Sequence, residues 1–84
     1  MNEKNANSLD VLSQLGKRVA YLRKERHYSQ LALALQCGLT KSYLSDLERG
    51  MRNPTLKVLA RLSAGLGVTL EELFRGVVPL DQLL

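Results

Sequence analysis

Residues 29–50 read SQLALALQCGLTKSYLSDLERG, and their pattern is the most informative in the chain about its fold. The first residue of this stretch, a serine, can cap a helix that runs to about Cys37. Gly38 follows, and glycine can adopt the left-handed conformation that ends a helix. Two residues later Thr40 can cap another helix, which runs to Arg49. The stretch therefore predicts two short helices joined by a tight turn.

The segment before this stretch has the spacing of a longer helix. Leucine and valine recur every three or four residues there, which is the period of an amphipathic helix. Ser8 is a candidate N-cap, so we expect a helix over residues 9–26. Gly16 would be a weak point inside it, because glycine is a poor helix former.

Two further helices are expected after the turn at the first proline. Thr55 can cap one that extends to about Gly65. Thr69 and Glu72 match a capping box, which begins a short fifth helix that ends near Phe74. The chain shows no strand-like alternation, so we predict an all-α, compact five-helix domain.

Apolar residues at helical spacing supply the candidate core of the second, third and fourth helices. The expected apolar positions are Leu31, Ala34, Leu35, Leu44, Leu47, Leu56, Leu59, Ala60 and Leu62. The chain is short enough for one domain, which we place at residues 8–76. Residues 1–7 are polar and predicted to be a disordered arm, and residues 77–84 form an apolar tail.

The composition excludes several classes of protein. A single cysteine, Cys37, and a single histidine, His27, allow neither an internal disulfide nor a structural zinc site. We therefore expect Cys37 in the core, His27 in a loop, and no metal or cofactor. No apolar run could span a membrane and no signal peptide is recognisable, so we expect a soluble, cytoplasmic protein. No catalytic constellation is present, so we do not expect an enzyme.

The polar face of the third helix favours nucleic acid as a partner. Two short helices around a glycine turn have helix-turn-helix geometry, and the net charge is +4. The outward positions of the third helix, opposite Leu44, Leu47 and Glu48, carry small or hydrogen-bonding groups together with a lysine and an arginine that suit phosphate or guanine. The small or hydrogen-bonding groups let a backbone approach a groove floor and suit base edges. These outward residues are Lys41, Ser42, Ser45, Asp46 and Arg49.

Over residues 15–73 the chain resembles the phage repressor/Cro-like, or Xre-type, helix-turn-helix domains. The residues that carry the resemblance are Arg18, Leu22-Arg23, Ser29-Gln30, Ala34, Gly38, Tyr43-Leu44-Ser45, Leu47-Glu48-Arg49-Gly50, Arg52-Asn53-Pro54, Leu59 and Leu66-Gly67-Val68. Two departures are Leu31-Ala32, where the family often has charged residues, and Gly65, where alanine is common. The resemblance implies a lambda-repressor-like fold and a transcriptional regulator, with some similarity to restriction–modification controller proteins.

The resemblance also implies roles for individual residues. Gln30 would hydrogen-bond a phosphate and brace the third helix. The residues implied to face base edges are Lys41, Ser42 and Asp46, with Ser45 and Tyr43 near the groove wall. Thr40 is a further candidate DNA contact. Arg49 and Arg52-Asn53 would hold the DNA backbone. Asp46 is an anion facing phosphate unless it accepts from a cytosine amine or orients a neighbouring Lys or Arg.

Arg23 and Glu48 match positions that form a partly buried ion pair between the first and third helices of the family. The implied partner is double-stranded DNA, bound by a homodimer, with no membrane and no small-molecule effector domain. The candidate dimer contacts are Leu66, Val68, Phe74, Val77, Val78, Leu80 and Leu83. A competing interpretation is that residues 77–84 only complete the core of the monomer. Another is an antitoxin or similar protein-interaction module on the same scaffold.

Overall fold

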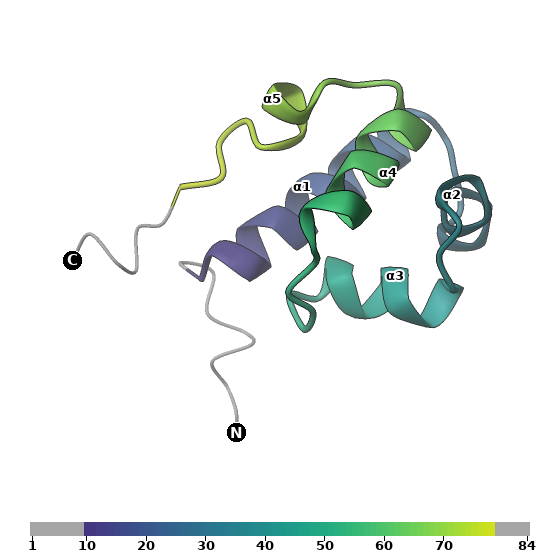
Figure 1. Ribbon diagram of the computed structural model, residues 1–84, viewed down its shortest axis with the longest axis horizontal. Coiled ribbons are helices and arrows are strands. Elements are labelled where there is room, and N and C mark those ends of the chain that lie inside the picture. The colour runs from purple at the N-terminus through teal and green to yellow at the C-terminus, as the bar shows by residue number, and fades with distance from the viewer. Residues whose placement is uncertain (1–9, 79–84) are drawn as a thin grey trace.

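The structure is a computed structural model that describes residues 10–78, and these residues form helices and no strand. The helices are α1 (Val11–Glu25), α2 (Gln30–Cys37), α3 (Lys41–Glu48), α4 (Leu56–Leu66) and α5 (Leu70–Leu73) (Figure 1). The prediction of an all-α, five-helix domain is therefore confirmed. The predicted arm at residues 1–7 lies outside the described residues.

A side chain caps the first turn of every helix. Ser29, Thr40, Thr55 and Thr69 each accept a hydrogen bond from the backbone N–H three residues on, as expected. The expectation for α1 was wrong, because its cap is Asp10 and not Ser8, and the helix begins at Val11. The carboxylate of Asp10 accepts the N–H of Leu12 at 3.1 Å, which satisfies one of the free donors of the first turn.

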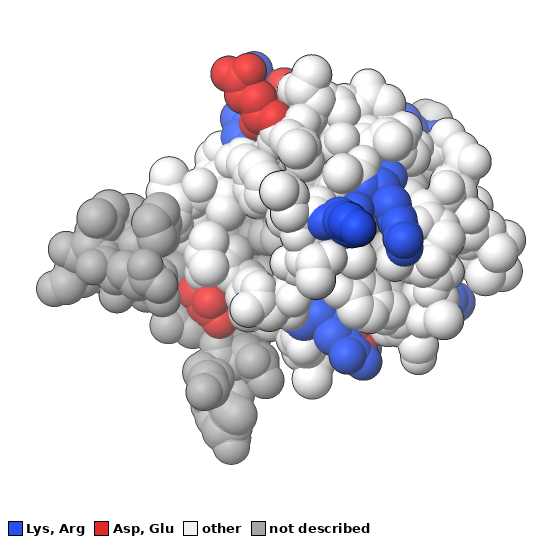
Figure 2. Space-filling view, in the orientation of Figure 1, with Lys and Arg blue, Asp and Glu red and all other residues white. Residues whose placement is uncertain are grey.

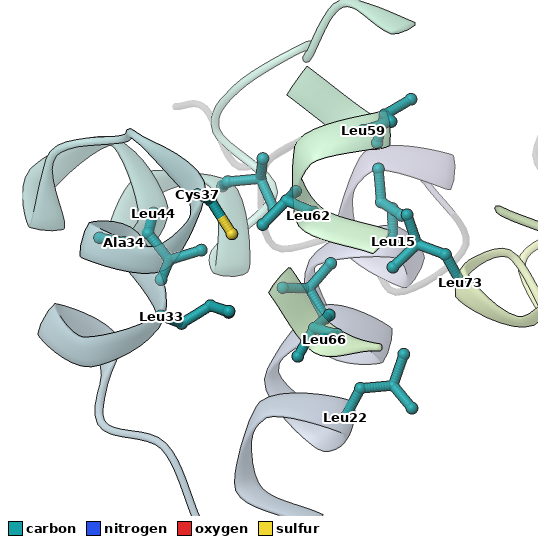
Figure 3. Close-up of a cluster of buried hydrophobic side chains, with 12 residues drawn as sticks. Leu15, Leu22, Leu33, Ala34, Cys37, Leu44, Leu59, Leu62, Leu66 and Leu73 are labelled. Carbon is teal, nitrogen blue, oxygen red and sulfur yellow. The ribbon is translucent and has the colours of Figure 1, made fainter. Parts of the chain in front are cut away.

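The described helices enclose one core built mostly of leucine (Figure 3). Helix α1 packs against α3, α2 packs against both α3 and α4, and α4 packs against α5. Helix α3 lies along the lower edge of the view in Figure 1, and α5 lies at the opposite edge. The buried apolar residues are Leu15, Val19, Leu22, Leu33, Ala34, Cys37, Leu44, Leu47, Leu59, Leu62, Leu66 and Leu73.

The inward face of α2 differs from the expected one. Leu31 and Leu35 are 50% and 72% exposed, although both were expected to face the core. The residues on the inner side are Gln30, Leu33, Ala34 and Cys37. These four positions have the i, i+3, i+4, i+7 spacing of one helix face. The first residue of that face is the polar Gln30, so the pattern of hydrophobic residues alone did not reveal which face of α2 is buried.

Two glycines allow helices to approach closely. A Cβ on Gly16 would lie 2.5 Å from the carbonyl oxygens of both Leu47 and Glu48, so only glycine fits where α3 ends against α1. A Cβ on Gly65 of α4 would lie 2.5 Å from Sγ of Cys37 on α2. Cys37 is buried as expected, and burial raises the pKa of its thiol above the ordinary value of 9.0. Both glycines are therefore packing residues.

The residues expected to form a dimer contact differ in how deeply they are buried in the single chain. Leu66 is 1% exposed inside the single chain, so its assignment to a dimer surface was wrong. Val68, Phe74 and Val77 are partly buried against the core, and Val78 is 41% exposed. Leu80 and Leu83 lie outside the described residues.

Two residues of α4 also differ from the expectation. Leu56 and Ala60 were expected to face the core, but both face solvent.

Candidate nucleic-acid interface

The turn between α2 and α3 comprises three residues, 38–40. Gly38 adopts φ 69°, the left-handed conformation expected for a glycine that ends a helix. The N–H of Leu39 then donates to the carbonyl of Ala34 at 2.9 Å, which closes the end of α2. Thr40 Oγ1 accepts the N–H of Tyr43 at 3.0 Å and begins α3. The two helices thus form the compact corner that the sequence predicted.

Helix α3 has one buried face and one exposed face. Leu44 and Leu47 are fully buried, whereas Lys41 and Ser42 are exposed. Ser45, Asp46 and Tyr43 are half-buried at the border between the two faces. Within residues 10–78, the side chains of Lys41 and Ser42 make no hydrogen bond or ion pair, so their polar groups are available to a ligand.

A nearly buried ion pair fixes the end of α3 to α1. Arg23 Nε and Nη2 donate to the two carboxylate oxygens of Glu48 at 2.7 Å and 3.0 Å. The side chains are 11% and 7% exposed, and Arg23 Nη1 also donates to the carbonyl of Tyr28 at 2.9 Å. The hydrogen bond to Glu48 raises the pKa of Arg23 above its ordinary value, so the guanidinium keeps its positive charge. This two-point geometry sets the orientation of α3.

Gln30 joins the same network from α2. Its Nε2 donates to Glu48 Oε1 at 2.9 Å, so one carboxylate connects α1, α2 and α3. Gln30 thus lies where it can brace α3. The amide nitrogen carries a second hydrogen, which remains available for another acceptor.

Basic residues continue past the end of α3. Arg49 is the C-cap of α3, and Arg52 and Asn53 are exposed in the following loop. Asp46 lies between the two arginines, with its carboxylate oxygens 2.5 Å from Arg49 Nη2 and 3.4 Å from Arg52 Nη2. Figure 2 shows Lys and Arg side chains over α4 and again near the end of α3.

Contacts that were not expected from the sequence hold α5 and the residues after it on α1. Arg18 Nη2 donates to the carbonyl of Glu72 at 2.9 Å and pairs with its carboxylate at 2.8 Å. Thr69 accepts the backbone N–H of Glu72, which is one of the two hydrogen bonds of a capping box. The Glu72 carboxylate pairs with Arg18 instead. Further along, the N–H of Val78 donates to Gln14 Oε1 at 2.7 Å. These contacts join residues 54 or more positions apart, so no local pattern reveals them.

Neither a metal site nor a membrane span is found in the described part of the chain. No group of three or more His, Cys, Asp or Glu side chains there could hold a metal ion. No helix between residues 10 and 78 is long and apolar enough to cross a membrane.

The chain belongs to the helix-turn-helix family of DNA-binding regulators, whose family model matches residues 19–73. This match covers α2, the turn and α3, and it confirms the Xre-type resemblance seen in the sequence.

The chain is similar to several known regulators in sequence or in structure. The control protein C.MunI from Mycoplasma is 42% identical over 69 residues, which cover 81% of this chain and 93% of C.MunI. The crystal structure of the restriction–modification controller protein C.AhdI from Aeromonas hydrophila has a TM-score of 0.74 and 38% identity. It covers 75% of this chain and 96% of C.AhdI. SinR, a master regulator for biofilm formation solved in complex with DNA, has a TM-score of 0.68 and 41% identity, over 71% of this chain and 97% of that chain.

Proposed function

We propose that this protein is a sequence-specific regulator of transcription that inserts α3 into the major groove of double-stranded DNA. The observation that carries the proposal is the contrast between the two faces of α3. Glu48 and the buried leucines fix one face to the domain, while Lys41 and Ser42 are exposed on the other. A rigidly held helix with free hydrogen-bonding groups near its N-terminus matches the way such helices read base edges.

The positions of the other polar residues divide the proposed contacts into two kinds. Base edges would be read by Lys41 and Ser42, with Ser45 and Tyr43 near the groove wall. Contacts to the backbone would come from residues at the borders of α2 and α3, namely Gln30, Thr40, Arg49, Arg52 and Asn53. The second N–H of the Gln30 amide can donate to a phosphate while the first remains on Glu48. The proposal assigns no catalytic step to any of these residues.

The salt dependence of binding tests this proposal. Fluorescence anisotropy on a random-sequence duplex should show affinity falling steeply between about 50 and 200 mM salt, because bound phosphates release counterions. Lys41→Ala should reduce the slope of log affinity against log salt by about 0.9, the contribution of one phosphate or groove charge. Arg75→Ala is the matched control, since this arginine is 73% exposed on the side chain but follows α5, far from α3. A flat salt dependence contradicts the proposal and favours a protein-interaction module.

The second part of the proposal is a homodimer that doubles the half-site. One short helix contacts too few base pairs to select a site in a genome, and a two-fold dimer would place two copies of α3 about 34 Å apart. The apolar residues after α4 that remain accessible supply the candidate surface. Within the described residues these are Val68, Phe74, Val77 and Val78. From the sequence alone we add Leu80 and Leu83 as further candidates.

Analytical ultracentrifugation of the whole chain tests the dimer. Val78→Asp should shift the protein toward the monomer, because it places a charge on the candidate surface. Leu35→Asp is the control, since Leu35 is 72% exposed on α2 and should leave the assembly unchanged. A wild-type chain that stays monomeric both free and on DNA contradicts this part of the proposal.

The third part of the proposal concerns the genes that this regulator controls. The similarity to nearly the full length of C.MunI and C.AhdI, over most of this chain, supports a control role of the restriction–modification type. Selection of binding sites from the organism's own DNA tests this role. Sites in front of restriction or methyltransferase genes are the expected result, and selected sites that avoid such genes contradict it.

A further inference from the structure

Two arginines of the candidate interface share one carboxylate. Asp46 Oδ1 lies 2.5 Å from Arg49 Nη2, and Asp46 Oδ2 lies 3.4 Å from Arg52 Nη2. The guanidinium of Arg52 also lies over the ring of Tyr43, 5.2 Å from its centroid. All four residues belong to α3 or to the loop that follows it, so they form one surface cluster beside the proposed groove contacts.

The stability of the fold does not explain this cluster. The arginine side chains are 60% and 50% exposed and Asp46 is 27% exposed, and ion pairs at such positions contribute little to folding. A negative charge beside the proposed DNA contacts also opposes phosphate binding. Asp46 thus has an electrostatic cost for DNA binding in general, and a compensating role is needed.

We propose that Asp46 is a positioning residue that increases discrimination between operator and random DNA, an inference that rests on the proposed function. Its carboxylate orders two long, flexible side chains before binding, and Tyr43 supports one of them by stacking. Ordered arginines fit the geometry of the correct site. The same carboxylate partly neutralises them, which weakens their attraction to phosphates at any other site.

The test compares Asp46→Asn with the wild type on a selected operator and on a random duplex. The amide is nearly isosteric but carries no charge. We expect affinity for the random duplex to rise about three- to tenfold, because repulsion from phosphate is removed. Affinity for the operator should not rise, so the ratio of the two affinities should fall at least threefold. Asp46→Glu keeps the charge and should retain the low affinity for random DNA.

Glu71→Gln is the matched control, because it removes one negative charge from an exposed residue on α5. It should leave the affinity ratio unchanged, and the melting temperature of Asp46→Asn should equal that of the wild type.

Four results would overturn the inference. Unchanged affinities for both duplexes in Asp46→Asn leave the proposed function intact but remove the positioning role. A changed preference at one base pair, with unchanged affinity for random DNA, shows that Asp46 reads a base directly. A lowered melting temperature with parallel loss on both duplexes shows a structural role. A wild-type chain that binds no duplex overturns the proposed function and this inference together.

Discussion

Glu48, the last residue of α3, accepts hydrogen bonds from Nε and Nη2 of Arg23 on α1, so one carboxylate ties the proposed recognition helix to the longest helix of the fold. The same carboxylate also accepts a hydrogen bond from the side-chain amide of Gln30 on α2. The relative orientation of three helices therefore depends on one nearly buried anion. This arrangement makes the position of α3 a property of the folded domain, established before any ligand binds.

Loss of this carboxylate should destabilise the fold. Glu48→Ala leaves Arg23 nearly buried without a counter-charge, and we expect the free energy of unfolding to fall by about 3 kcal/mol or more. Chemical denaturation measures the change. Glu71→Ala, an exposed acid on α5, is the control and should have almost no effect. Equal stability of Glu48→Ala, Arg23→Ala and the wild type would show that the pair does not contribute to stability.

The close approach at Gly16 leads to an unusual expectation. Alanine is the better helix former by about 1 kcal/mol, yet Gly16→Ala should destabilise the protein by about 1–3 kcal/mol. The reason is that the new methyl group would meet the carbonyl oxygens of Leu47 and Glu48 at 2.5 Å. Thermal and urea denaturation measure the difference. Lys17→Ala, at the exposed neighbouring position, should be neutral or slightly stabilising. A stabilised Gly16→Ala protein would contradict the packing of α3 on α1.

Burial of Cys37 predicts a stability that depends on pH. The thiol pKa in the folded chain lies above 9.0, so the folded state favours the neutral thiol. Its stabilising contribution is fully present below pH 9.0 and is lost as pH rises through the folded pKa. One such proton changes the unfolding free energy by at most about 1.4 kcal/mol per pH unit.

Urea denaturation of the wild type and of Cys37→Ala at several pH values measures this contribution. The two proteins differ only at residue 37, so the difference between the two slopes isolates the contribution of the thiol. We expect the wild type to lose stability faster above pH 9.0. Parallel slopes, together with rapid modification of Cys37 by a thiol reagent in the folded protein, would contradict its burial.

Most of the fold was predictable because local signals determine it. Thr40, Gly38 and the leucines of α3 define a helix start, a helix end and a buried face within one short segment. The errors arose where the signal was polar or distant. Gln30 lies on the inner side of α2 because its amide donates a hydrogen bond to Glu48. Hydrophobic spacing gives no sign of this hydrogen bond. The cap of α1 was misplaced because Ser8 and Asp10 are both good caps.

Only part of the candidate site could be predicted from the sequence. The outward face of α3 followed from periodicity alone, and the pairing of Arg23 with Glu48 came only from the resemblance to a family. Asp46 had three possible roles in the sequence. Its position between Arg49 and Arg52 is a property of the three-dimensional arrangement, because Arg52 lies beyond the end of the helix.

A comparison of sequence preference between variants measures whether the exposed face of α3 reads base edges. An operator is first selected from random DNA by the wild-type chain. Binding of Lys41→Ala and Ser42→Ala is then measured on every single-base variant of that operator. We expect each substitution to relax the preference at particular operator positions, by about 1–3 kcal/mol per base contact, while Arg75→Ala changes the preference at none. An unchanged ranking of the operator variants in both α3 mutants would contradict the account.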